Sequence, residues 1–362
     1  MSDQLYRALA RRLDSIPPGF PPSKSGVELE LLARLYTPEE AAIVTAMRLN
    51  YEPVATIAKR AAMNPGAAYD ILCAATDKGL VRTRTRDGER TFALMPETSG
   101  FTGFSTPKSI RDDAKAAQLY VQWIQETRGG SLSDAPAARR IIPIEESISF
   151  SLAIHPYEQA SEMLATARSW GALDCMCRRR TGLAGQGCSH LLESCLVFAP
   201  DEGAYDDDEL IRAISLEESL RILRQAADDG LVHTTSNIGD HPSNICNCCP
   251  CCCSLLRGVV EFHRPTVIAH SDFRATVDET ACEGCGDCLK RCHFAALSLP
   301  ESVCVVDPTR CVGCGQCTLA CSFEALSLER RLASETLPRL ADLDEWMAEH
   351  AKNRGLSLTE CQ

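Results

Sequence analysis

Two stretches of the chain repeat one another, and their shared cysteine spacing constrains the fold more than any other feature. Residues 282–299 read CEGCGDCLKRCHFAALSL, and residues 311–328 read CVGCGQCTLACSFEALSL, an offset of 29 residues. The cysteines recur, as do one phenylalanine and the closing Ala-Leu-Ser-Leu. Repetition of this kind indicates two copies of one supersecondary unit related by pseudo-symmetry.

Each copy of the repeat carries cysteines in the spacing C-x2-C-x2-C-x3-C. Three thiolates spaced this closely on a tight loop can bind three corners of one iron–sulfur cubane, and the glycines between them permit the curvature. In such runs the fourth cysteine binds the neighbouring cluster. We therefore predict one [4Fe–4S] cluster on Cys282, Cys285, Cys288 and Cys321. A second [4Fe–4S] cluster is predicted on Cys311, Cys314, Cys317 and Cys292.

From about residue 278 to 330 the chain resembles the dicluster ferredoxins of bacteria, on the strength of these two cysteine runs. The resemblance implies a ferredoxin-like fold and transfer of single electrons. In one respect the chain departs from that family, because His293 and Ser322 stand where a proline usually follows each fourth cysteine. Zinc is the alternative ligand for C-x2-C pairs, although interlocked four-cysteine runs are typical of clusters.

The distribution of the cysteines indicates a reducing compartment. Nineteen of the 21 cysteines lie between residues 175 and 321, whereas only Cys73 precedes and only Cys361 follows that stretch. Secreted disulfide proteins are normally shorter and lack a long cysteine-poor half. The charged N-terminus has no apolar signal-peptide core, and no run of about 18 apolar residues is present. We therefore expect a cytoplasmic protein with no membrane partner, in which clustered thiols serve metal or redox chemistry.

A middle region carries two further groups of cysteines. The first comprises Cys175, Cys177, Cys188 and Cys195. The second comprises Cys246, Cys248, Cys249, Cys251, Cys252 and Cys253. Six cysteines in eight residues make no sense as core packing, so we predict one or two more [4Fe–4S] clusters here. The grouping that we prefer gives one cluster to the first group and one to four members of the second. A mixed arrangement, in which each group donates to both clusters, stays open.

Charged and titratable side chains accompany these middle cysteines. Arginines at 178–180 follow Cys177 directly, and positive charge near a cluster raises its potential. The alternative is that these arginines form a solvated turn. His190, His233 and His241 stand near the cysteine groups, where a metal ligand and an ordinary surface or core histidine are the two interpretations.

The N-terminal part has the pattern of a winged helix-turn-helix. Thr37 caps a predicted helix over residues 38–49, and a second helix covers 54–62. A third helix is predicted from Asn64 to Lys78. Two predicted strands, 80–86 and 90–95, flank an Asp-Gly pair, which is a strong hairpin signal.

These patterns predict an α+β multidomain protein: a winged helix-turn-helix, a Cys-rich α+β middle domain and a C-terminal ferredoxin-like dicluster domain. The expected domain boundaries are 1–96 for a helical arm with the winged helix, 97–136 for a linker with one helix (110–127), 137–270 for the Cys-rich domain, 271–332 for the dicluster domain and 333–362 for a helical tail. The middle domain is expected to open with a strand over 140–144 and a helix over 157–168, and Ser215 caps a helix over 216–229.

The balance of charge favours a docking role for the winged helix over DNA binding. The net charge of the chain is −12, and the predicted recognition helix offers Asp70 and Asp77 but no arginine. A reader of the major groove needs base-contacting side chains near that helix's N-terminus and cations around it. The wing carries arginines at 82, 84, 86 and 90, which do not reverse this balance. The whole layout resembles accessory 4Fe–4S binding proteins that occur beside multi-subunit redox enzymes.

The sequence therefore predicts an electron-transfer protein or subunit, which passes single electrons through several [4Fe–4S] clusters between a ferredoxin or flavoprotein donor and a catalytic partner. No Gly-rich dinucleotide fingerprint and no Walker A motif is present, so no nucleotide cofactor is expected. The alternative is a redox-sensing transcriptional regulator that uses the winged helix. A third interpretation, catalysis at a middle cluster with an open coordination position, leaves the enzymatic status undecided.

Overall fold

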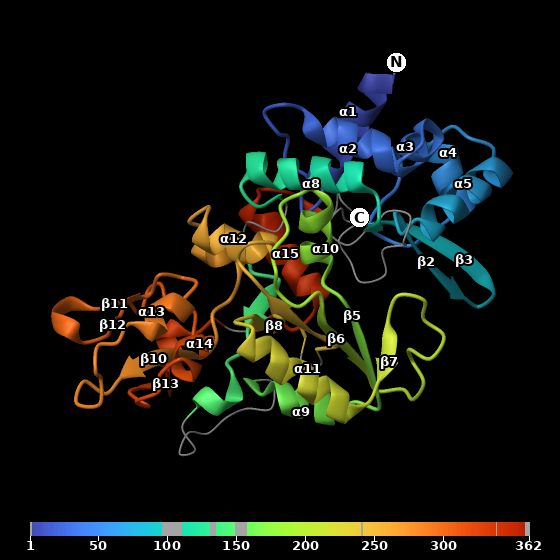
Figure 1. The fold of residues 1–362 in the computed structure, drawn as a ribbon. Coiled ribbons are helices and arrows are strands. Elements are labelled where there is room, and N and C mark those ends of the chain that lie inside the picture. The colour runs from blue at the N-terminus through green and yellow to red at the C-terminus, as the bar shows by residue number, and fades with distance from the viewer. Residues whose placement is uncertain are drawn as a thin grey trace. The chain divides into compact units, whose positions relative to one another are not determined.

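The computed structural model describes residues 2–95, 111–130, 135–148, 158–239, 242–337 and 339–358, which form two compact units of mixed helix and sheet (Figure 1). The first unit comprises Met1–Ala135, Met176–Gly187 and Met347–Gln362, and the second comprises Pro136–Cys175 and Cys188–Trp346. The α+β prediction is confirmed at this level. None of the described helices is long and apolar enough to cross a membrane.

The first unit begins with helices packed around Trp123. Helix α1 (Ser2–Asp14) and helix α2 (Val27–Leu35) are followed much later in the chain by α8 (Ala114–Thr127), which packs on α2. Trp123 of α8 is fully buried, lies 4.8 Å from Phe20 between ring centroids, and donates a 3.0 Å hydrogen bond from Nε1 to the Pro21 carbonyl. The predicted start of this helix at residue 110 lies outside the described residues, and the described helix begins at Ala114.

Three helices and a hairpin follow in the segment from Pro38 to Leu94. Helix α3 (Pro38–Thr45) starts at the predicted Thr37 cap but stops four residues short of the predicted end. Helices α4 (Val54–Arg60) and α5 (Pro65–Asp77) come next, and Asn64 Oδ1 accepts a 2.9 Å hydrogen bond from the Gly66 N–H at the start of α5. Strands β2 (Val81–Arg86) and β3 (Glu89–Leu94) pair in antiparallel register, and β1 (Glu52–Pro53) adds to β3.

The hairpin turn confirms the Asp-Gly signal. Asp87 and Gly88 both have positive φ angles, of 52° and 80°. This is the backbone that a two-residue turn between right-twisted strands requires. Glycine adopts it without strain, and aspartate tolerates it better than most residues.

The second unit is built on one six-stranded antiparallel sheet in the order β4-β8-β9-β6-β5-β7. The strands are β4 (Arg139–Ile141), β5 (Ser169–Asp174), β6 (Glu193–Ala199), β7 (Arg212–Ile214), β8 (Val232–Ser236) and β9 (Asn244–Cys248). Helices α9 (Ala160–Ala165) and α11 (Leu216–Asp228) cover the sheet (Figure 1), and Ile222 of α11 is buried in a core with Leu164, Leu196 and Ile245. Strand β4 and helix α9 are both shorter than predicted, and residue 157 lies outside the described part.

The repeated segment forms a small lobe of short elements. Strand β10 (Phe273–Val277) pairs with β13 (Leu326–Arg330), and β11 (Leu297–Ser298) pairs with β12 (Val305–Val306). The short helices α13 (Asp287–Arg291) and α14 (Gln316–Leu319) occupy equivalent places in the two copies. Helix α12 (Ser254–Val260) connects the sheet to this lobe, and α15 (Leu343–Asn353) follows it.

The C-terminal end of α11 anchors the lobe. Arg291 donates a 2.8 Å hydrogen bond to the Ala227 carbonyl, and Gln316 donates a 2.7 Å bond to the Leu231 carbonyl. His293 Nε2 lies 2.7 Å from the Gly230 carbonyl. The last carbonyls of a helix lack partners within the helix, so donors from the lobe satisfy them. His293, which stands where the bacterial ferredoxins have proline, therefore has a docking role.

Candidate metal centres

Two cavities in the lobe are each lined by four predicted ligands. The first cavity, of about 330 Å³, is lined by Cys282, Cys285, Cys288 and Cys321 together with Cys304. The second cavity, of about 350 Å³, is lined by Cys292, Cys311, Cys314 and Cys317. Each cavity thus takes three cysteines from one copy of the repeat and the fourth from the other copy, which is the interlocked arrangement that the spacing predicts.

Glycines with positive φ shape both cavities. At Gly313 (φ +71°) a Cβ atom would lie 2.0 Å from the Phe273 carbonyl oxygen, and at Gly284 (φ +65°) it would lie 2.2 Å from the Ser302 carbonyl oxygen. No side chain fits against a backbone atom at such distances, and an L-residue is strained at these φ angles. The loops therefore need glycine at both positions, and the space beside them stays open for a cofactor.

Backbone N–H groups point at the sulfurs in a pseudo-symmetric way. The Ala275 N–H lies 3.4 Å from Cys311 Sγ, and the Cys304 N–H lies 3.4 Å from Cys282 Sγ. Cys304 follows Ala275 by the same 29 residues that separate the two cysteine runs. Hydrogen bonds to the sulfurs stabilise thiolates and set cluster potentials.

Cys304 is a residue that the sequence analysis missed. It is buried, lines the first cavity and places its Sγ 3.7 Å from Cys288 Sγ. Burial, followed by the neighbouring Cys288, raises the pKa of Cys304 to about 12, so this thiol keeps its proton at neutral pH. Extending the repeat upstream by the same offset would have paired Cys304 with Ala275 and revealed it.

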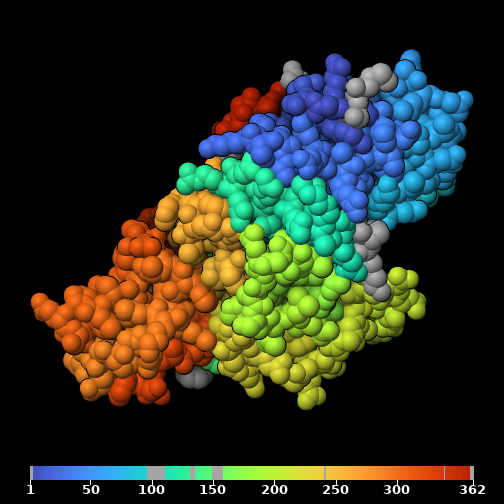
Figure 2. All heavy atoms as spheres, turned by 45° about the horizontal axis from the view of Figure 1, so that its top comes forward, coloured from blue at the N-terminus to red at the C-terminus, as the bar shows by residue number. Residues whose placement is uncertain are grey.

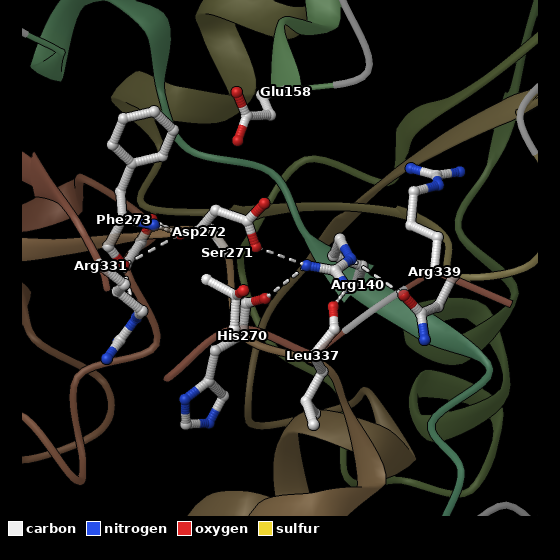
Figure 3. A network of polar contacts seen from close by, with 12 residues as sticks. Arg140, Glu158, His270, Ser271, Asp272, Phe273, Arg331, Leu337 and Arg339 are labelled. Carbon is white, nitrogen blue, oxygen red and sulfur yellow. Dashed lines mark hydrogen bonds and ion pairs between the residues drawn. The ribbon is translucent and has the colours of Figure 1, made fainter. Parts of the chain in front are cut away.

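A buried polar network holds the loop of the second cavity (Figure 3). Ser271 Oγ donates a 2.7 Å hydrogen bond to the Gly313 carbonyl, and Arg331 donates to the carbonyls of Phe273 and Cys311. Arg140 of β4 pairs with Asp272 at 2.9 Å and also donates to the His270 carbonyl at 3.2 Å. The sheet and the lobe therefore share one set of buried hydrogen bonds around this cavity.

Four middle-region cysteines form a compact cluster, which we call the tetrathiol group: Cys188, Cys249, Cys251 and Cys252. All four sulfurs lie within 4.8 Å of one another, with separations of 3.9 Å from Cys188 to Cys249 and 3.6 Å from Cys188 to Cys252. Burial, followed by Cys249, raises the pKa of Cys251 to about 12. Without a cation these thiols hold their protons.

The other middle cysteines of the second unit form a more extended row, which we call the second thiol group: Cys175, Cys195, Cys246, Cys248 and Cys253. Cys195 interacts with Cys175 and Cys246, and these contacts with burial raise the pKa of the Cys195 thiol. Cys248 interacts with Cys246 and Cys253 and has a raised pKa for the same reasons. The preferred grouping, which kept the two sequence groups apart, is not the one that the structure has; the mixed alternative is.

The remaining candidates have other partners. Cys177 lies on α10 (Met176–Leu183) in the first unit, with the three arginines. There Arg180 stacks 4.1 Å from the Tyr120 ring centroid, and Arg179 bonds Asp112 at 2.8 Å, so these arginines do not form a solvated turn. His190 Nδ1 lies 3.1 Å from Asp229 Oδ2, buried His233 lies 2.5 Å from Asn247 Oδ1, and His241 is outside the described residues.

Comparison with known proteins identifies one part of the chain. Residues 304–327 match the family model of the 4Fe–4S binding domain. The matched segment contains Cys311, Cys314, Cys317 and Cys321, so 4Fe–4S binding is indicated for this lobe. No curated protein and no solved structure matches the chain.

Proposed function

We propose that this protein carries single electrons between redox proteins by means of two [4Fe–4S] clusters in its C-terminal lobe. The observation that carries the proposal is the pair of interlocked cavities, each lined by four cysteines and each closed by a glycine at which no side chain fits. A [4Fe–4S] cluster, when bound, supplies one-electron chemistry at low potential. The cysteines would hold it, and the N–H groups of Ala275 and Cys304 would stabilise the sulfur charge.

The second thiol group supports a third cluster. Its sulfurs extend in a row, beyond the reach of one ion, and Cys246, Cys248 and Cys253 belong to the same apolar core as Phe294 and Val312. Cys292 and Cys314 of the second cavity pack against that core. Close spacing of redox centres speeds electron transfer, so we propose a path from the second thiol group through the second cavity to the first.

The first cavity is the more open end of this path. Cys285 is exposed, and Phe323, which also lines this cavity, is 48% exposed, whereas Cys311 and Cys317 of the second cavity are buried. Figure 2 shows the segment that contains Cys282–Cys292 (orange) at the surface of the second unit. We propose that a redox protein partner docks here, with an apolar contact at Phe323.

Paired serine variants test the interlocked ligand sets through their iron content. Cys321→Ser is combined either with Cys285→Ser, in the same predicted site, or with Cys314→Ser, in the other. The first pair is expected to lose about four irons per chain and the second about eight, since the first pair damages one cluster twice. The opposite pattern would overturn the interlocked assignment. Wild-type protein that accepts no electrons from dithionite, followed by EPR, would overturn the function itself.

The segment from Pro38 to Leu94 is, in our proposal, a winged helix used for docking. Its wing arginines have partners in their own unit: Arg84 lies 4.2 Å from the Tyr51 ring centroid, and Arg82 donates a 2.7 Å hydrogen bond to the Leu49 carbonyl. Cations engaged in this way are poor phosphate ligands. The regulator remains the alternative; a cluster-dependent electrophoretic shift of the protein's own promoter at low salt would favour it over docking.

A further inference from the structure

We propose that the tetrathiol group is a closed site for a single Zn²⁺ ion and is not an iron–sulfur cluster site. The group differs from every cluster ligand set predicted above, and the proposal stands apart from the electron-transfer function. It rests on the separation of the four sulfurs, on the way the chain builds the site, and on the contrast with the cavities of the lobe.

The sulfur separations match one ion. A tetrahedral site with Zn–S bonds of about 2.3 Å has S···S edges of about 3.8 Å. The separations of 3.6 Å and 3.9 Å from Cys188 lie on either side of that value. Thiolates on a cubane each bind a different iron and point outward from it, so they stand farther apart than the ligands of one ion.

The lobe provides an internal reference for this geometry. Among the residues that the structure describes, the tetrathiol group is the one set of three or more cysteine, histidine or acidic side chains whose ligand atoms all lie within 4.8 Å. The cysteines of the two cavities surround open space instead. One structure thus contains both spacings, and the tight spacing is confined to the middle region.

Two local devices hold the four cysteines in place. The turn after β9 is closed by a 3.0 Å hydrogen bond from the Cys253 N–H to the Cys249 carbonyl, which brings Cys249, Cys251 and Cys252 round one point. The Asp229 carboxylate accepts a 2.9 Å hydrogen bond from the Leu191 N–H and also contacts His190, which fixes the loop carrying Cys188. Three ligands from one turn and one from a distant loop are usual for structural zinc.

Zinc suits this donor set because four thiolates fill a tetrahedron and leave no open position. The ion would join the loop at Cys188 to the turn at 249–252, which are 61 or more residues apart. Such a crosslink stabilises the fold by restricting the unfolded chain, and it has no redox step.

The test is metal analysis of the full-length protein, purified anaerobically, as wild type, Cys251→Ser and Cys73→Ser. Cys251 is exposed, and Cys73 is a matched thiol of the first unit outside every proposed site. We expect about one zinc per chain in the wild type and in Cys73→Ser, and at least a tenfold loss of zinc in Cys251→Ser with iron unchanged.

X-ray absorption at the zinc edge of the wild type keeps the test decisive if Cys251→Ser fails to fold. Four sulfur ligands at about 2.3 Å are expected. Wild-type protein without zinc, a zinc edge dominated by nitrogen or oxygen ligands, or a loss of one or about four irons in Cys251→Ser would each overturn the proposal.

Discussion

The lobe and the tetrathiol group are both rich in cysteine, yet they hold their sulfurs in opposite ways. In the lobe, glycine loops keep eight cysteines around two cavities. In the tetrathiol group, a turn and a fixed loop bring four sulfurs to within 4.8 Å of one another. The difference shows that the number of cysteines does not give the number of clusters. The space that the backbone leaves between the sulfurs decides whether a cubane or one ion fits.

Gly313→Ala breaks this comparison most strongly, because it fills the space that defines a cluster site. The new Cβ would lie 2.0 Å from the Phe273 carbonyl oxygen, so the loop that carries Cys311 and Cys314 must move. We expect loss of about four irons per chain, with zinc retained. Iron and zinc analysis measures both.

Gly88→Ala is the control for this prediction. Gly88 also has a positive φ, of 80°, but a Cβ there meets nothing within 4 Å. We expect it to keep all its metals and to lose about 1 kcal/mol of unfolding free energy from backbone strain alone. Gly313→Ala protein with full iron content would show that the open space is not what the cluster needs.

Exposure to air in the presence of EDTA separates the two kinds of site by their redox chemistry. Cluster iron and sulfide are oxidised and released, and Cys285 at the exposed edge of the first cavity gives access. Zinc has no redox chemistry. We expect most of the iron to be lost while about one zinc per chain stays bound, as elemental analysis over time will show. Parallel loss of both metals would mean that the tetrathiol group depends on the clusters.

The parts of the site that could be predicted from the sequence are those that local spacing determines. The eight lobe cysteines lie in two short runs, and within a run the loop geometry leaves few arrangements. The tetrathiol group joins Cys188 to a turn 61 residues later, so it depends on which strands pair. No local pattern encodes that choice, and the preferred grouping failed for this reason.

The same division applies to the fold. The Asn64 cap and the Asp87–Gly88 turn were predicted because each satisfies its own backbone. The end of α3 at Thr45 and the shortness of β4 were not, since tertiary packing sets such limits. Helix α10 belongs to the first unit although cysteines of the second unit flank it in sequence, which no composition boundary indicates.

The smallest expected effect concerns the two cavities themselves, which differ where the first has Cys304 and the second has Ala275. A protonated Cys304 thiol, 3.7 Å from Cys288 Sγ, donates a weak hydrogen bond to a ligand sulfur and stabilises the reduced state. Removing such a bond, worth about 0.5 kcal/mol, lowers a one-electron potential by about 20 mV. We therefore expect Cys304→Ala to lower one of the two lobe potentials by that amount in an EPR-monitored titration. Ala275→Cys is the reciprocal variant and is expected to raise the other potential; a shift of the same potential by both would contradict the assignment of Cys304 to the first cavity.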